Sequence, residues 1–131
     1  MDETEQDEPI IHKNFRDLAP MIVRKRLIIE GTTMKPIIGY EIKTYLLKLT
    51  TTMNMTIVTY PSIQHDEAYG YSGYLCWKES GSHMYTWHET EERPNFFSID
   101  IYTCKQFHLE DVIKLTKMFV GENLLELTWR E

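Results

Sequence analysis

The nine residues FFSIDIYTC, Phe96 to Cys104, alternate between two kinds of side chain. One parity holds Phe97, Ile99, Ile101 and Thr103, and the other holds Phe96, Ser98, Asp100, Tyr102 and Cys104. Successive side chains of a β-strand point to opposite faces of the sheet. The pattern therefore predicts a strand in which Phe97, Ile99 and Ile101 face a layer of helices, while Tyr102 and Cys104 lie on the other face.

Two segments have apolar residues at helical spacing and can supply that layer. The first begins near Pro36, a residue suited to the first turn of a helix, and its stripe comprises Ile38, Ile42, Tyr45, Leu46, Leu49 and Met53. The second, Leu109–Val120, is followed by Gly121, a common residue at helix ends, and its stripe comprises Val112, Leu115 and Phe119. Each helix has one apolar stripe, so both can cover the same face of a sheet.

Further strands are predicted on both sides of this alternating segment: Val23–Gly31, Met55–Tyr60, Tyr71–Lys78, His83–Glu89 and Asn123–Trp129. Residues 63–70 read as a polar loop, and residues 79–82 (ESGS) as a tight turn. The order is β-α-β-β-β-β-α-β, and the short connections in the middle imply an antiparallel sheet. The fold class is therefore α+β, a two-layer sandwich with both helices on one face of the sheet.

The second face of this sheet has no helices to cover it. It carries Tyr85, Trp87, Tyr102 and Cys104 if the alternation holds. An uncovered aromatic face predicts a ligand site or the contact surface of a partner subunit.

Charge and composition limit the function further. The opening MDETEQDEP holds five acids and no base, which leaves about −1 of the net charge of −6 for the rest of the chain. We expect residues 1–9 to be an acidic disordered tail and residues 10–131 a single domain. The absence of a basic surface argues against nucleic-acid binding. No apolar run is long enough to cross a membrane and no secretory signal is seen, so we expect a cytoplasmic protein with no membrane partner.

Single motifs say little about chemistry. Two cysteines make no disulfide framework, and five scattered histidines predict no metal site. Ser80 followed by Gly81 is common turn chemistry, and a free cysteine such as Cys104 is usually a small buried apolar residue.

The motifs taken together resemble the bacterial and archaeal S-adenosylmethionine decarboxylase family. That family carries Ser-Gly, then a Glu-Ser-His turn, then His-Thr-Trp-Pro-Glu, then Asp-x-Phe-Thr-Cys-Gly. The counterparts here are Ser72-Gly73, Glu79-Ser80-Gly81, Tyr85-Thr86-Trp87-His88-Glu89 and Asp100-Ile101-Tyr102-Thr103-Cys104-Lys105. The resemblance extends from the first strand to the last and leaves out the acidic head.

The resemblance implies a self-processing enzyme. The chain would split between Glu79 and Ser80, and Ser80 would become a pyruvoyl cofactor that forms a Schiff base with S-adenosylmethionine and accepts electrons as the carboxylate leaves. Cys104 would reprotonate the product carbon, and Ser72 would assist catalysis. Trp87 would pack against the adenine and Glu89 would accept ribose hydroxyls. The implied pathway is polyamine (spermidine) synthesis, and the implied assembly is a homodimer.

The chain departs from the family pattern at two histidines. Gly81 replaces the histidine after the reactive serine, and Tyr85 replaces the histidine that assists processing. A tyrosine hydroxyl, with a pKa near about 10, is a poor base at neutral pH. His83 lies two residues away on the same strand face and is the candidate substitute. Two alternatives stay open: a relative that decarboxylates arginine or ornithine, and a non-processing binding or regulatory paralogue.

Overall fold

A computed structural model describes residues 8–131 of the chain. The elements in chain order are β1 (Lys25–Thr33), α1 (Gly39–Thr52), β2 (Ser62–Asp66), β3 (Gly70–Trp77), β4 (Ser80–Trp87), β5 (Asn95–Thr103), α2 (Leu109–Val120), a short 3₁₀ turn (Gly121–Asn123) and β6 (Leu124–Arg130). The predicted acidic head lies mostly outside the described residues, so the division into a tail and one domain stays a prediction.

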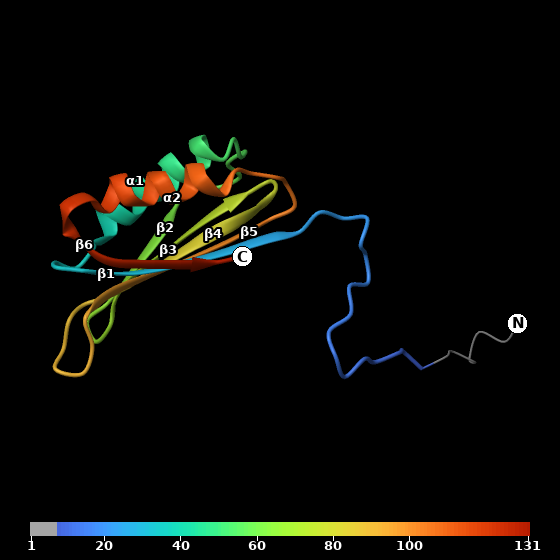
Figure 1. The fold of residues 1–131 in the computed structure, drawn as a ribbon, viewed down its shortest axis with the longest axis horizontal. Helices are drawn as coiled ribbons and strands as arrows, with labels where there is room; N and C mark the ends of the chain where they lie inside the picture. The colour runs from blue at the N-terminus through green and yellow to red at the C-terminus, as the bar shows by residue number, and fades with distance from the viewer. Residues whose placement is uncertain (1–7) are drawn as a thin grey trace, which may run out of the picture.

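All six strands form one antiparallel sheet in the order β2-β3-β4-β5-β1-β6. Figure 1 shows α1 and α2 side by side on one face of this sheet and, within residues 8–131, no helix on the other. The predicted α+β sandwich with two helices on one face is therefore confirmed. Except for the strand predicted at Met55–Tyr60, the predicted strands and helices begin and end within three residues of the observed ones.

Strand β5 has the register that its alternation predicts. Phe97, Ile99 and Ile101 are fully buried under the helices, whereas Tyr102 and Cys104 are exposed on the other side. Each fully buried aliphatic or aromatic side chain contributes roughly 1.5–3 kcal/mol relative to an exposed one. A one-residue slip would move these three side chains into water, so burial fixes the register of β5.

Polar side chains join the helices to each other and to the sheet. The hydroxyls of Tyr45 on α1 and Thr116 on α2 lie 2.8 Å apart, and the indole Nε1 of Trp77 on β3 donates to Thr50 Oγ1 at 2.7 Å. All four residues are buried. Buried polar groups need partners, so these pairs fix how α1 sits over β3 and over α2.

The strand predicted at Met55–Tyr60 is wrong. This segment touches the sheet through one isolated bridge, Ile57 to Trp77, while Val58 and Tyr60 stay exposed. The second strand is instead Ser62–Asp66, inside the segment predicted as a polar loop, and all five residues pair with β3. It is an edge strand whose only apolar residue is Ile63, so its composition gives almost no strand signal.

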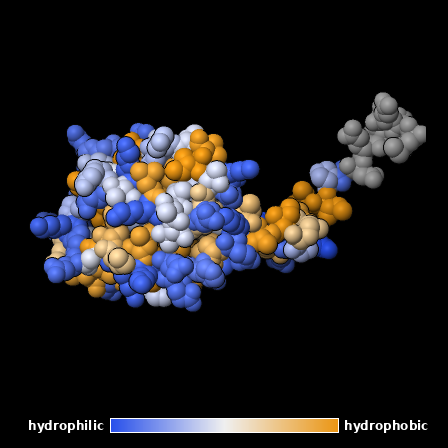
Figure 2. All heavy atoms as spheres, turned by 90° about the horizontal axis from the view of Figure 1, so that it is seen from above, coloured by the Kyte–Doolittle hydropathy of each residue, from blue (hydrophilic) through white to orange (hydrophobic). Residues whose placement is uncertain are grey.

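The chain before β1 extends away from the folded body, as Figure 1 shows. Figure 2 shows a run of apolar residues along this extension. Phe15, Ile11 and Met21 are each at least 80% exposed. Residues 10–23 are called the N-terminal arm below.

Candidate active site at the Glu79–Ser80 peptide

A two-residue turn joins β3 to β4. Trp77 pairs with Ser80, so only Lys78 and Glu79 form the turn. The predicted turn at residues 79–82 is therefore two residues shorter than expected, and Ser80 is the first residue of β4. Ser80 pairs with β3 on one side and with Thr103 of β5 on the other, which holds it within the sheet.

The backbone of Ser80 is strained. Its φ is +137°, a value that residues other than glycine rarely adopt. Such a conformation costs on the order of 1–3 kcal/mol and persists only where the surroundings enforce it. Gly81, the next residue, has no positive φ. Gly81 is needed for close packing, because a Cβ there would lie 2.8 Å from the carbonyl oxygen of Leu75.

The carbonyl group of Glu79 accepts a hydrogen bond from the backbone N–H of Cys104 at 3.0 Å. This is the carbonyl of the peptide bond that joins Glu79 to Ser80. A donor in this position polarises the carbonyl and would stabilise negative charge that develops on its oxygen.

Thr56 fixes the side chain of Glu79. The Thr56 backbone N–H donates to Glu79 Oε1 at 2.9 Å, and the Thr56 hydroxyl donates to Oε2 at 3.2 Å. These bonds, chiefly the one from the backbone, hold the pKa of the Glu79 carboxyl below its usual value. Both the side chain and the carbonyl oxygen of Glu79 are therefore held in place directly before Ser80.

A hollow of about 220 Å³ opens beside Ser80 on the helix-free face, and we call it the Ser80 hollow. It is lined by Arg26, Tyr74, Ser80, Gly81, Ser82, His83, Asp100 and Tyr102. Arg26 and Asp100 form a bidentate ion pair: Arg26 Nε donates to Asp100 Oδ1 at 3.0 Å and Nη2 donates to Oδ2 at 2.9 Å. Asp100 is also directly opposite His83 in the register. Burial lowers the pKa of His83, and the charge of Asp100 opposes that shift.

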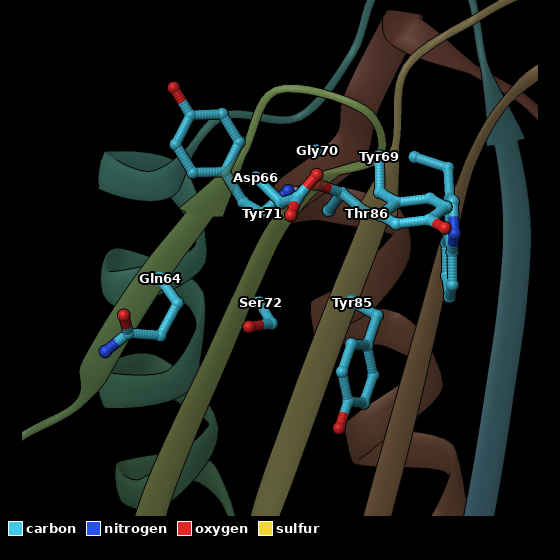
Figure 3. A pocket seen from close by; sticks show the side chains of 9 residues that line it. Gln64, Asp66, Tyr69, Gly70, Tyr71, Ser72, Tyr85 and Thr86 are labelled. Carbon is cyan, nitrogen blue, oxygen red and sulfur yellow. Dashed lines mark hydrogen bonds between the residues drawn. The ribbon is translucent and has the colours of Figure 1, made fainter.

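A second hollow, of about 360 Å³, lies toward the other end of β4, and we call it the Trp87 hollow. It is lined by Gln64, Asp66, Tyr69, Gly70, Tyr71, Ser72, Tyr85, Thr86 and Trp87. Figure 3 shows Ser72 and Tyr85 on neighbouring strands within it, where they are directly paired. Tyr85 is five residues from Ser80, a separation of about 17 Å along a strand.

Aromatic side chains connect the two hollows. The ring centroids of Tyr74 and His83 are 4.4 Å apart, those of His83 and Tyr85 5.5 Å, and those of Tyr85 and Trp87 6.0 Å. The row continues to Phe96, 5.3 Å from Trp87. The helix-free face therefore offers a continuous aromatic surface between Ser80 and Trp87.

The residues singled out in the sequence thus form two groups. Glu79, Ser80, His83 and the backbone of Cys104 lie at one end of β4, and Ser72, Tyr85 and Trp87 lie toward the other. Glu89 follows β4, is exposed and lines neither hollow. Sequence reasoning missed Thr56 and Arg26. Nothing in the sequence marks Thr56 as a partner of Glu79, because the contact depends on how residues 55–60 pass the turn.

Neither a metal-ligand cluster nor a membrane-spanning helix is found among residues 8–131. In this part of the chain no three His, Cys, Asp or Glu side chains are grouped as metal ligands would be. No helix within it is both long and apolar enough to cross a membrane.

The chain forms a two-layer α+β domain with two hollows lined by side chains of its helix-free sheet face. Comparison with protein families identifies it further: residues 38–128 match the sequence profile of S-adenosylmethionine decarboxylase. This match covers more than half of the chain, so the chain belongs to that family. A comparison with curated proteins finds no match. Family membership supports decarboxylation of S-adenosylmethionine as its activity.

Proposed function

We propose that this chain is a pyruvoyl-dependent S-adenosylmethionine decarboxylase that makes its own cofactor by splitting between Glu79 and Ser80. Two observations at the same peptide bond carry the proposal. Ser80 is strained, and the carbonyl group before it already accepts a hydrogen bond from the Cys104 N–H. We further propose that the enzyme is cytoplasmic and acts in spermidine synthesis.

The first step is attack of Ser80 Oγ on the carbonyl carbon of Glu79, which converts the amide into an ester. Negative charge develops on the carbonyl oxygen, where the Cys104 N–H is placed to stabilise it. His83 lines the same hollow, and its lowered pKa keeps the imidazole neutral at pH 7 and able to take the hydroxyl proton. Breaking the amide also releases the backbone strain at Ser80.

The second step removes the α-proton of Ser80 and expels the Glu79 carboxylate. Hydrolysis of the resulting dehydroalanine releases ammonia and leaves a pyruvoyl group at the start of residues 80–131. The site fits this group because β4 is paired on both sides at its first residue. The new terminus would stay fixed in the sheet beside the Ser80 hollow.

The pyruvoyl group would supply a carbonyl that binds the substrate amine and accepts electrons as the carboxylate leaves as CO₂. Cys104 is exposed directly after β5 and is assigned the proton that returns to the product carbon. Trp87 is proposed to pack against the adenine ring of the substrate. Asp66 lines the Trp87 hollow, unlike Glu89, and is the better placed carboxylate for the ribose hydroxyls.

We propose that the working site forms between two copies in a homodimer. Within one chain, Ser72 and Tyr85 lie too far along the strands to reach Ser80. Two copies that pack their helix-free faces together in antiparallel fashion would place the Trp87 hollow of one over the Ser80 hollow of the other. The face suits an interface, since Tyr74, Tyr85 and Tyr102 are each about 40% exposed on it.

Two alternatives make different predictions. An arginine or ornithine decarboxylase would not need the Trp87 hollow, whose size and aromatic lining favour an adenine-bearing substrate. A non-processing binding paralogue is favoured by Tyr85 and Gly81, which supply no imidazole where the family has two. Such a paralogue would keep an intact peptide bond before Ser80.

The test is the intact mass of the purified full chain. The proposal expects two polypeptides, residues 1–79 and a pyruvoyl-headed piece of residues 80–131. Ser80→Ala should stay whole because alanine has no nucleophile, whereas Ser82→Ala, two residues along the same strand, should split. A wild-type chain that stays whole after long incubation contradicts the proposal. Calorimetry with S-adenosylmethionine would then test the binding paralogue.

A further inference from the structure

The N-terminal arm has large apolar side chains that residues 8–131 leave exposed. Ile10, Ile11, Phe15, Leu18, Met21, Ile22 and Val23 are all at least 42% exposed, and Phe15 is 94% exposed. Single exposed apolar residues are ordinary, but seven within fourteen positions are typical of a segment that packs against another surface. Figure 2 shows apolar side chains along the part of the chain that projects beyond the folded body.

A local elbow turns the arm away from its own domain. Arg24 donates to the Asp17 carboxylate and, at 3.2 Å, to the Ala19 carbonyl. The Ile22 N–H also donates to the Ala19 carbonyl at 2.9 Å. The segment before the elbow is thereby directed outward, where a surface on another molecule can receive it.

A shallow hollow of about 140 Å³ on the helix-free face has chemistry that matches the arm. It lies over β1 and β6 and is lined by Glu30, Gly31, Thr32, Phe96, Glu126, Leu127 and Thr128. Among residues 8–131, neither Glu30 nor Glu126 forms a salt bridge, and neither do Lys13 or Arg16 of the arm. A cavity of roughly this size accepts a benzene-sized group such as a phenylalanine ring.

We propose that the arm of one copy packs into this hollow on a second copy, with Phe15 in the hollow and Lys13 and Arg16 facing Glu30 and Glu126. The inference rests on the homodimer of the proposed function. It adds a second contact, outside the catalytic groups, through which two copies hold each other.

The sheet register connects the two surfaces. Lys25, where the arm joins β1, pairs with Thr103, and Thr103 also pairs with Ser80. The arm therefore leaves the sheet at the end that holds Ser80. In the antiparallel dimer this end faces the other copy's Trp87 end, where Trp87, Phe96 and Thr32 form one row. Phe96 and Thr32 line the hollow, so the arm starts close to its receiving surface.

The test is the dimer dissociation constant of the full chain, measured by sedimentation over a range of concentrations. Phe15→Ser should raise this constant roughly tenfold or more, because it removes a buried ring from the interface. Met118→Ser is the matched control: Met118 is 71% exposed on α2, far from the proposed contact, and its loss should leave the constant unchanged. Arg16→Glu should weaken the dimer, and adding Glu126→Lys should restore it.

Equal constants for Phe15→Ser and Met118→Ser would overturn the inference, and so would a failed rescue by Glu126→Lys or a wild-type chain that is monomeric throughout. Intact mass on the same samples separates this inference from the proposed function. An unsplit chain with an arm-dependent dimer rejects only the self-cleavage, and a split chain with an arm-independent dimer rejects only the role of the arm.

Discussion

The two ends of strand β4 differ in what surrounds them. At the Ser80 end the backbone is strained, the preceding carbonyl has a backbone donor, and an ion pair fixes Asp100 beside His83. At the Trp87 end the hollow is larger, mainly apolar and free of strained residues among those that line it, apart from the glycine Gly70. The proposed function assigns the breaking and making of bonds to the Ser80 end and the binding of a flat apolar group to the Trp87 end.

The largest expected effect is at the donor to the Glu79 carbonyl. Cys104→Pro removes the N–H, and loss of one such donor typically slows a reaction by roughly 100- to 1,000-fold. Cys104→Ala keeps the N–H, so it should split at the wild-type rate but lose decarboxylation. The rate at which residues 1–79 appear on a denaturing gel measures both. Equal splitting rates for the two variants would show that the N–H has no part in cleavage.

A change at the other end should separate binding from cleavage. Trp87→Ala removes a stacking surface worth about 1–3 kcal/mol, so the dissociation constant for S-adenosylmethionine should rise roughly 5- to 150-fold. The splitting of the chain should be unaffected. Titration calorimetry gives the binding constant and a gel gives the splitting rate. If Trp87→Ala binds S-adenosylmethionine as tightly as the wild type, adenine does not bind in the Trp87 hollow.

The pH dependence of splitting tests His83. The pKa of His83 is lowered from 6.5, so the neutral base is present at pH 7 and is lost as pH falls through that lowered value. The splitting rate should therefore be flat near pH 7 and decline in the acid range. The groups facing His83 are Tyr74, Tyr85 and Asp100. Asp100→Asn removes the charge that opposes the shift, so the decline should move to lower pH. If the splitting rate of the His83→Ala and Asp100→Asn variants depends on pH as that of the wild type does, His83 is not the base.

A smaller effect is expected at Ser82, which pairs with the buried Ile101 of β5. Ser82 Oγ is buried without a hydrogen-bond partner among residues 8–131. An unsatisfied buried hydroxyl costs about 1–3 kcal/mol, so Ser82→Ala should raise the free energy of unfolding by about 1 kcal/mol. Thermal unfolding of the uncleaved Ser80→Ala background, with and without Ser82→Ala, measures it. A loss of stability would show that the hydroxyl has a partner in solution, such as water.

The sequence predicted the sheet well where burial alone sets the pattern. The alternation of Phe97, Ile99 and Ile101 is a direct record of one buried face, and the structure agrees. It failed at β2, because an edge strand with one apolar residue needs no apolar alternation. Met55–Tyr60 has strand-like residues, but of these only Met55 is buried and only one bridge forms.

Motif spacing selected the candidate site residues but could not give their arrangement. Ser72, Ser80 and Tyr85 are close in sequence, yet a straight strand places Ser80 and Tyr85 about 17 Å apart. The contact between Cys104 and the Glu79 carbonyl, and that between Thr56 and the Glu79 side chain, join segments that only the fold brings together. Strain at Ser80 is likewise invisible in a sequence, because it is a backbone angle.

The most direct test of a site shared between two copies is cleavage in trans. A Ser80→Ala/Tyr85→His chain cannot split itself, but it can offer a histidine to the Ser80 of a partner. Mixing it with fresh wild-type chain should accelerate the splitting of the wild-type chain, while Ser80→Ala alone should not. Time-resolved intact mass distinguishes the two chains. A wild-type splitting rate that is the same with either partner would contradict the shared site. Groups of the same chain would then have to activate Ser80.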